Sequence, residues 1–392
     1  MATRMGSARI RRNMKVGKGA SDLSNLRFRR NKEDEMDVPK IPLEDFKIPS
    51  SEYASELDIK NEYEGALEFG VIGAGQCGGR LVKSFYDLGY KKAIAINTAV
   101  SDLNPLEIPD NQKLKIGGEG SGKDMTKGEK AAEEAYQMIF DKMKQVFGTV
   151  DKVIVSVGFG GGTGAGGLST IIKVAQKYLE FLGSKNPKTD VVVVAALPTG
   201  GELSSKLVKE NTQKITATMF KAAKVAAVGP ILLIDNSKIE RLYRGIPPKL
   251  FWKTINDTIT GLFQMFNYLA TQESGYSTFD AEDYKVLMKT PGLSVLGVTS
   301  VDLGETKLSQ ALQDNFKKTL LASRVDYATA SKAACIVCAG KTTMESVPMD
   351  EFNYGFDTIA HLIGNATVYR GLYEIESEGV RAYTMIAGLS GV

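Results

Sequence analysis

The chain has little cysteine, histidine or tryptophan: its 392 residues include three cysteines, one histidine and one tryptophan. Three cysteines are too few for a disulfide framework. Cys335 and Cys338 form a CxxC motif inside the apolar run 333–339, and no second CxxC exists to complete a zinc site. We therefore interpret the pair as small apolar residues of a buried strand. The histidine, His361, falls among apolar residues of an expected helix, which favours a packed or surface position over a catalytic role.

Long apolar runs are also absent, since no run reaches the roughly 18 residues needed to cross a bilayer. The basic N-terminus does not resemble a secretory signal. These absences predict no membrane insertion and a cytoplasmic location, which would be the host cytoplasm if the chain is phage-encoded. Hydrophobic residues make up 43% and charged residues 24%, which is typical of a globular protein. The length predicts two domains and an appendage.

The appendage is residues 1–66, a charged N-terminal arm that we expect to be flexible. Its first thirty residues are basic, the following stretch to Glu68 is mainly acidic, and Pro39, Pro42 and Pro49 interrupt any helix. One interpretation is a solubilising tail. The alternative is a contact arm for a DNA-binding adaptor, a cargo or a neighbouring subunit.

Apolar strands alternate with helices over residues 67–247, which predicts a mostly parallel sheet covered on both faces. The expected strands lie at 67–72, 93–96, 152–157, 191–196 and 230–234, and one helix is expected over about 127–147. A long helix follows, with apolar residues at three- and four-residue spacing, and we assign 248–283 to this spine helix and the loop after it. Residues 284–392 predict a smaller domain of mixed α+β structure. The predicted fold class is therefore α/β with a parallel-sheet nucleotide-binding domain.

Three glycine-rich loops follow these strands, and two of them match known motifs incompletely. Residues 73–78 read GxGxxG, but the dinucleotide fingerprint requires an acid at the end of the second strand, where the chain has Asn97-Thr98-Ala99. Residues 117–123 approach the P-loop pattern, but Asp124 replaces the hydroxyl that would hold magnesium. Neither a nicotinamide cofactor nor a P-loop is favoured.

The third loop, residues 158–167, lies between a clear strand and a clear helix. Its glycines allow the backbone to approach phosphate oxygens, and the helix N-terminus adds partial positive charge. This loop predicts phosphate binding more strongly than the other two.

The sequence GGGTGAGG at residues 160–167 resembles the signature GGGTG[ST]G of tubulin and FtsZ, with Ala165 in place of the usual hydroxyl. Further segments are similar to that superfamily in the same order, through roughly residues 67 to 390, and the FtsZ-like and TubZ-like prokaryotic or phage tubulins are the closest in kind. The resemblance implies GTP or GDP as ligand, with Mg²⁺ whose protein ligands are unknown.

The resemblance also implies roles for individual residues. Its phosphate loops carry over to Gly75, Gln76, Cys77, Asn97, Gly120, Ser121, Gly122, Gly160, Gly161, Gly162, Thr163 and Gly164. Glu202 and Lys206 correspond to an acid and a base of the ribose loop, and Asn236 to an asparagine that binds guanine. The segment Trp252 to Asp257, which includes Asn256, is similar to one in which an aromatic ring stacks on guanine and an aspartate accepts from its edge.

Two carboxylates are candidates for catalysis. Asp280 and Asp283 resemble the FtsZ acids that reach the nucleotide of the next subunit and activate water, although Thr278 stands where asparagine is usual. Ala99 replaces an aspartate often found in FtsZ, which puts a metal or phosphate contact in doubt. Because the acids follow the far end of the spine helix, we expect head-to-tail homopolymers that hydrolyse GTP at the subunit interface.

The sequence thus predicts an assembly-dependent GTPase that forms cytoskeletal filaments for positioning or segregating phage or plasmid DNA. The absence of a terminal peptide for a membrane tether favours this function over an FtsZ-like cell-division role. A GTP-binding structural filament without hydrolysis is a further alternative.

Overall fold

The computed structural model describes residues 59–301, 307–323, 325–364 and 366–390. Most of the predicted arm, residues 1–58, lies outside the described residues, so the predictions about it stay predictions. The described residues form one compact unit.

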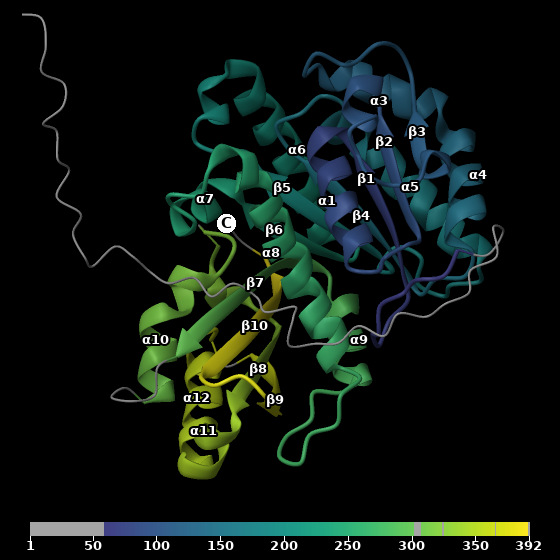
Figure 1. The fold of residues 1–392 in the computed structure, drawn as a ribbon. Helices are drawn as coiled ribbons and strands as arrows, with labels where there is room; N and C mark the ends of the chain where they lie inside the picture. Colours follow the sequence, from purple (N-terminus) through teal and green to yellow (C-terminus); the bar gives the residue numbers. More distant parts are fainter. Residues whose placement is uncertain (1–58, 302–306, 324, 365, 391–392) are drawn as a thin grey trace, which may run out of the picture. The chain divides into compact units, whose positions relative to one another are not determined.

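Ten strands of the described chain join into one sheet in the order β3-β2-β1-β4-β5-β6-β7-β10-β8-β9 (Figure 1). Their bounds are β1 Phe69–Ala74, β2 Ala93–Asn97, β3 Lys113–Lys115, β4 Lys152–Gly158, β5 Val191–Leu197, β6 Pro230–Asp235, β7 Gly292–Val301, β8 Lys332–Gly340, β9 Thr367–Ile375 and β10 Val380–Leu389. Neighbours from β3 to β7 are parallel, β10 is antiparallel to β7 and β8, and β8 is parallel to β9. The predicted α/β class with a mostly parallel sheet is confirmed.

Helices cover both faces of this sheet, which accounts for the nearly continuous apolar runs of β4 and β5. The principal helices are α1 Gly75–Asp87, α2 Val100–Leu103, α3 Met125–Glu134, α4 Tyr136–Phe147, α5 Thr163–Phe181, α6 Lys206–Lys224, α7 Asn236–Leu242, α8 Pro248–Leu269, α9 Ala281–Lys289, α10 Leu308–Thr319, α11 Lys341–Ser346 and α12 Met349–Leu362.

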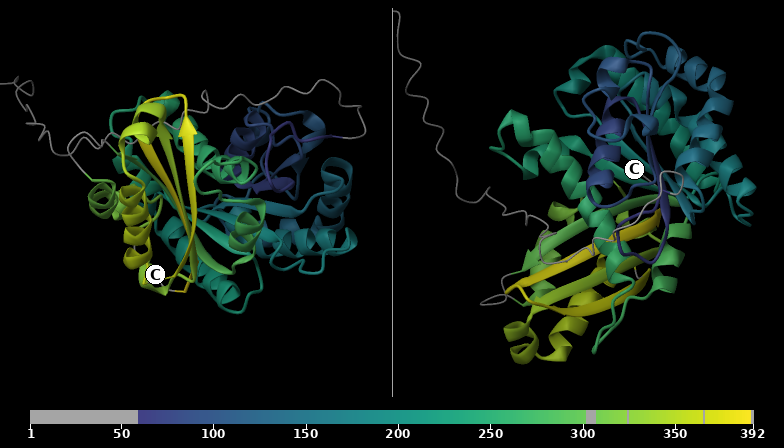
Figure 2. Two further views of the ribbon diagram at one scale, coloured as in Figure 1. Left: turned by 90° about the horizontal axis from the view of Figure 1, so that it is seen from below. Right: turned by 45° about the vertical axis from the view of Figure 1, so that its right-hand side comes forward.

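The two faces carry separate apolar cores. One core packs α3, α4, α5, α6, α10 and α12 against the sheet, and the other packs α1, α8 and α9. Figure 2 shows α10 to α12 gathered on one side of the strands of the C-terminal half. Cys335 belongs to the first core and Cys338 to the second, because residues three apart on a strand point to opposite faces. The CxxC motif is therefore two buried strand residues that cannot hold a shared metal ion.

Two features differ from the sequence-based expectation. The helix predicted over 127–147 is two helices, α3 and α4, interrupted at Ala135, whose φ of −92° and ψ of 8° are not helical. The strands of the smaller C-terminal domain also continue the sheet of the nucleotide-binding half, since β6 pairs with β7. The domain boundaries at 66, 247 and 283 stay predictions. Within the described residues, no helix is long and apolar enough to cross a bilayer.

Candidate functional site

A cavity of about 320 Å³ opens beyond the carboxyl ends of the parallel strands. The loops after β1, β2, β4 and β5 line it, together with the starts of α7 and α8. Sixteen of the predicted site residues line this cavity: Gly75, Gln76, Cys77, Asn97, Gly120, Ser121, Gly122, Gly160, Gly161, Gly162, Thr163, Gly164, Glu202, Asn236, Trp252 and Asn256. Ligands of open α/β sheets bind at this edge.

Close approach between loops makes glycine necessary in the cavity wall. Gly75 has a φ of +73°, and a Cβ there would lie 3.1 Å from the backbone nitrogen of Gly164. A Cβ on Gly162 would lie 2.5 Å from Ser121 Oγ. These contacts bring the first helix, the 120–122 loop and the N-terminus of α5 together, so that α5 directs its free backbone N–H groups and partial positive charge at one place.

Three hydroxyl groups connect these loops. Thr98 Oγ1 and Thr163 Oγ1 are 2.7 Å apart, and Thr163 Oγ1 lies 3.1 Å from Ser121 Oγ. All three residues are buried. Asn211 of α6 fixes the same region by donating to the carbonyls of Lys123 at 2.7 Å and Gly160 at 3.3 Å. These cavity-lining loops are thus held in one arrangement by contacts within the protein.

Two carboxylates line the cavity, and both accept hydrogen bonds. Asp102 accepts from Asn97 Nδ2 at 3.0 Å and from Gln76 Nε2 at 3.4 Å. Glu202 accepts from the backbone nitrogen and the hydroxyl of Thr199, at 2.8 and 3.1 Å. Burial raises the pKa of the nearby Cys77 thiol to about 12, and the charge of Glu202 adds to this. Cys77 therefore adds no negative charge where phosphates would bind.

At the other end of the cavity lie Trp252, Asn256, Asn236 and Arg80. Trp252 and Asn256 are one turn apart on α8, and Asn236 is the first residue of α7. Both asparagines are buried, at 6% and 7% exposed. Within the described part of the chain neither carboxamide makes a hydrogen bond, so both remain available to a ligand.

Two predicted nucleotide-binding residues do not line the cavity. Asp257 follows Asn256 on α8 and turns away from it, and its carboxylate accepts from Ser84 Oγ at 3.0 Å and from Lys253 Nζ at 2.6 Å. Lys206, at the start of α6, has an 87% exposed side chain and lies 3.7 Å from Glu210. The proposed contacts of Asp257 with the base and of Lys206 with the ribose receive no support from these positions.

Asp280 and Asp283 also lie outside the cavity, as the sequence predicts. They form a capping box at the start of α9: Asp280 accepts from the Asp283 backbone nitrogen at 2.9 Å, and Asp283 accepts from that of Asp280 at 3.3 Å. Burial raises the pKa of Asp283, with a smaller contribution from the charge of Asp280. The 22 residues of α8 span about 33 Å, and Trp252 and Asn256 line the cavity from its first half, whereas the loop before α9 follows its last residue.

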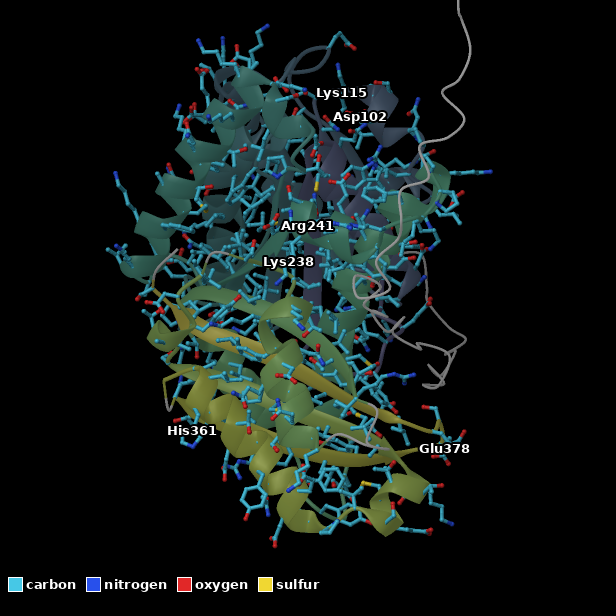
Figure 3. All side chains as sticks on the ribbon, turned by 90° about the vertical axis from the view of Figure 1, so that its left-hand side faces the viewer. Asp102, Lys115, Lys238, Arg241, His361 and Glu378 are labelled. Atoms are coloured by element: carbon cyan, nitrogen blue, oxygen red, sulfur yellow. The ribbon has the colours of Figure 1, made fainter. Side chains whose placement is uncertain are left out.

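The sequence-based interpretation missed four polar residues of the cavity: Arg80, Thr98, Asp102 and Lys123. Arg80 lies one turn along α1 from Gln76, and Asp102 lies on α2, three residues beyond Ala99. His361 is exposed, as the sequence allowed, and lies well away from Asp102 in Figure 3. No group of three or more acidic, histidine or cysteine side chains in the described ranges is arranged to hold a metal ion.

Comparison with known proteins finds similarity to tubulin-like proteins in both sequence and fold. Residues 68–244 match the Tubulin/FtsZ family, GTPase domain. The chain is 28% identical over 331 residues to a "Tubulin-like protein CetZ" of Pyrococcus abyssi, which covers 81% of this chain and 85% of the relative. It is 26% identical over 313 residues to "Cell division protein FtsZ 1" of Pyrococcus woesei, covering 78% of each. GDP-form protofilaments of TubZ from Bacillus thuringiensis serovar israelensis superpose with a TM-score of 0.71 at 16% identity, covering 84% of this chain and 89% of TubZ.

Proposed function

We propose that this protein binds GTP in the cavity, polymerises head to tail and hydrolyses GTP at the subunit interface, because residues 68–244 match the Tubulin/FtsZ family, GTPase domain. One observation carries the proposal. The cavity lies at one end of α8, and the two carboxylates suited to activating water lie beyond the other end.

The two ends of the cavity suit the two ends of a guanine nucleotide. Gly162, Thr163 and the N-terminus of α5 offer backbone N–H groups and hydroxyls to phosphate oxygens. The free carboxamides of Asn236 and Asn256 offer both acceptors and donors to the base, and Trp252 offers an aromatic surface. The volume lies at the lower end of the range for small-molecule sites.

Mg²⁺ fits this cavity as an ion held mainly by the nucleotide. Such ions take one or two protein carboxylates and complete their shell with phosphate oxygens and water. Asp102 is the carboxylate that the phosphate-facing end provides, and Gln76 and Asn97 hold it in place. When bound, the ion would neutralise phosphate charge. The orientation of the nucleotide would still depend on the chain's own loops.

Hydrolysis requires a second copy of the chain. Asn256 lines the cavity, and the 13 residues of α8 from there to Leu269 span about 20 Å before the loop that carries Asp280 and Asp283, so these acids do not reach their own nucleotide. Stacking copies head to tail would bring them to the phosphates of the adjoining copy, and such a heterologous contact repeats into a filament. Since each site is completed only at a contact, GTP turnover would rise with polymer formation.

Light scattering and phosphate release, measured together with GTP, GDP and ATP over a range of protein concentrations, test this function. We expect scattering and turnover with GTP alone, above a threshold concentration. Mixing an Asp280→Asn chain with a Gly162→Ala chain should recover phosphate release, because one supplies the nucleotide and the other supplies intact acids. Turnover that is independent of protein concentration would contradict the shared site.

The cargo is a separate part of the proposal. We propose phage or plasmid DNA, reached through a DNA-binding adaptor or through the basic residues that precede residue 33. Cosedimentation of filaments with DNA, using the full chain and one that starts near Leu67, tests this. Equal pelleting of DNA by both chains would exclude the arm. The relative named as a cell-division protein keeps an FtsZ-like role as the alternative.

A further inference from the structure

Arg80 is a cationic residue of the cavity wall to which the proposed function assigns no contact with the nucleotide. It lines the cavity, and its Cζ lies 5.9 Å from the centroid of the Trp252 ring. This separation is at the outer limit of a cation–π contact, so the ring holds the guanidinium only weakly. Over the described ranges, Arg80 makes no hydrogen bond or ion pair with the protein. Its five N–H donors are therefore available to a ligand.

The position of Arg80 is at the base-facing end of the cavity. Arg80 follows Gln76 by one turn of α1, about 6 Å further from the phosphate-facing end. One turn further along α1 from Arg80, Ser84 donates a hydrogen bond to Asp257 and so connects α1 to α8. Arg80, Trp252 and Asn256 thus surround the space just above this contact.

The two carboxylates of the cavity do not form ion pairs with Arg80. Asp102 is held by Gln76 and Asn97, and Glu202 is held by Thr199. An arginine without a carboxylate partner beside an aromatic ring and two free carboxamides is suited to a planar ligand with two adjacent acceptors.

We propose that Arg80 selects guanine by donating two hydrogen bonds to O6 and N7 of the base, an inference that rests on the proposed nucleotide binding. Guanine presents two acceptors along this edge, and the fork of an arginine matches them. Adenine presents N7 beside an amino group, which would face the guanidinium donor to donor. Asn236 and Asn256 would serve the opposite edge, where guanine carries N1–H and the 2-amino group.

Calorimetric titration with nucleoside diphosphates tests Arg80 without hydrolysis. The probes are GDP, 7-deaza-GDP, which lacks the N7 acceptor, inosine diphosphate, which lacks the 2-amino group, and ADP. The native chain should bind GDP about 10-fold or more tightly than 7-deaza-GDP, the scale of one hydrogen bond to a charged group. Arg80→Ala should reduce that ratio to within about 2-fold and keep the native penalty for inosine diphosphate.

Lys83→Ala is the matched control, because Lys83 is a cation of the same helix that pairs with Asp87 outside the cavity. It should keep both ratios. Arg80→Lys, which keeps the charge but not the fork, should lose most of the 7-deaza ratio, and it serves as the test if the alanine variant does not fold. Equal weakening of GDP and 7-deaza-GDP by both Arg80 variants, or no 7-deaza penalty in the native chain, would overturn this inference alone. Absence of GDP binding by the native chain would instead overturn the proposed function.

Discussion

Ser84 of α1 donates a hydrogen bond to Asp257 of α8 at 3.0 Å, directly beneath the cavity that Asn256 lines. Two adjacent residues of α8 therefore have different surroundings: Asn256 lines the cavity, and Asp257 connects α8 to α1. Residues that follow one another on a helix point about 100° apart, and here this difference directs Asn256 to the cavity and Asp257 to Ser84.

Asn256→Ala should lower the preference for GDP over ADP by roughly 3- to 10-fold, because it removes one base-facing hydrogen-bonding group. Asp257→Ala should keep that preference and instead lower the free energy of unfolding by about 1 kcal/mol, since it removes the contact with Ser84. Calorimetric titration and urea unfolding of both variants measure the two effects, and Ser84→Ala is the control for the helix contact. Loss of guanine preference in Asp257→Ala with normal stability would show that Asp257 reads the base.

Gly162→Ala should abolish tight nucleotide binding, because its Cβ would lie 2.5 Å from Ser121 Oγ and 2.7 Å from the backbone nitrogen of Asp124. One loop has to move, and overpacking of this kind costs about 1 to 3 kcal/mol. Gly118→Ala is the matched control, since no atom lies within 4 Å of its Cβ and Gly118 does not line the cavity. Affinity for GDP measures the difference. Similar affinities for the two variants would mean that the loops do not hold the phosphates as proposed.

Asp280 has two functions to separate, because it caps α9 as well as standing among the proposed catalytic acids. Asp280→Asn keeps a good capping group, so phosphate release should fall by at least about 10-fold while the thermal midpoint stays near native. Asp280→Ala should lose both, with about 1 kcal/mol of stability removed. Scattering should show filaments of the asparagine variant that persist after GTP addition. Native turnover in that variant would leave the cap as the only function of Asp280.

Lys238 gives the protein a pH dependence. It is buried on α7, donates to the carbonyls of Lys317 at 2.6 Å and Ala322 at 3.2 Å, and lies beside Arg241 in Figure 3. Burial lowers the pKa of Lys238 to about 8, against a smaller raising effect of Asp235 and with a further lowering by Arg241. Between pH 8 and 10.5 the unfolded chain therefore binds more protons at this residue than the folded chain.

The contribution of Lys238 to the free energy of unfolding should thus rise with pH across this window, by on the order of 1 to 3 kcal/mol. Buried thiols act in the opposite sense, because the pKa values of Cys335 and Cys338 are raised to about 12 and the unfolded thiols ionise first. The test is therefore the difference between native and Lys238→Met chains in urea unfolding at pH 7.5 and pH 9.5. A difference that does not change with pH would contradict the lowered pKa.

That the glycine-rich loops would line one cavity was predictable from the sequence, because a glycine-rich loop between an apolar strand and a helix is typical of a binding site at the carboxyl edge of a parallel sheet. The buried strands were predictable because their apolar runs are nearly continuous. The bounds of α6 were not predicted, since charged residues obscure the spacing of its buried positions. Of its 19 residues, only Val208, Asn211, Ile215, Met219 and Ala223 are buried. Local sequence also gave no sign of the interruption at Ala135.

The base-facing half depends on contacts between distant segments. Arg80 and Trp252 are 172 positions apart in the chain, and their contact follows from the packing of α1 on α8. The place of Asp102 in the cavity was not predicted either. Ala99 stands where FtsZ often has an aspartate, and this difference did not identify the carboxylate three residues further along the chain. The direction in which Asp257 points was decided by a partner on another helix, Ser84, which no local pattern identifies.

The pairing of β6 with β7 joins the strands before residue 247 and the strands after residue 283 into one sheet. β6 pairs with β7 through Pro230, Ile231 and Leu232. A chain cut after residue 247 would leave this side of β6 as a free edge, with an apolar strand and open backbone groups that recruit other strands. The N-terminal half made alone should therefore aggregate, and exchange of C-terminal halves between relatives would succeed only where the new β7 strand pairs with β6.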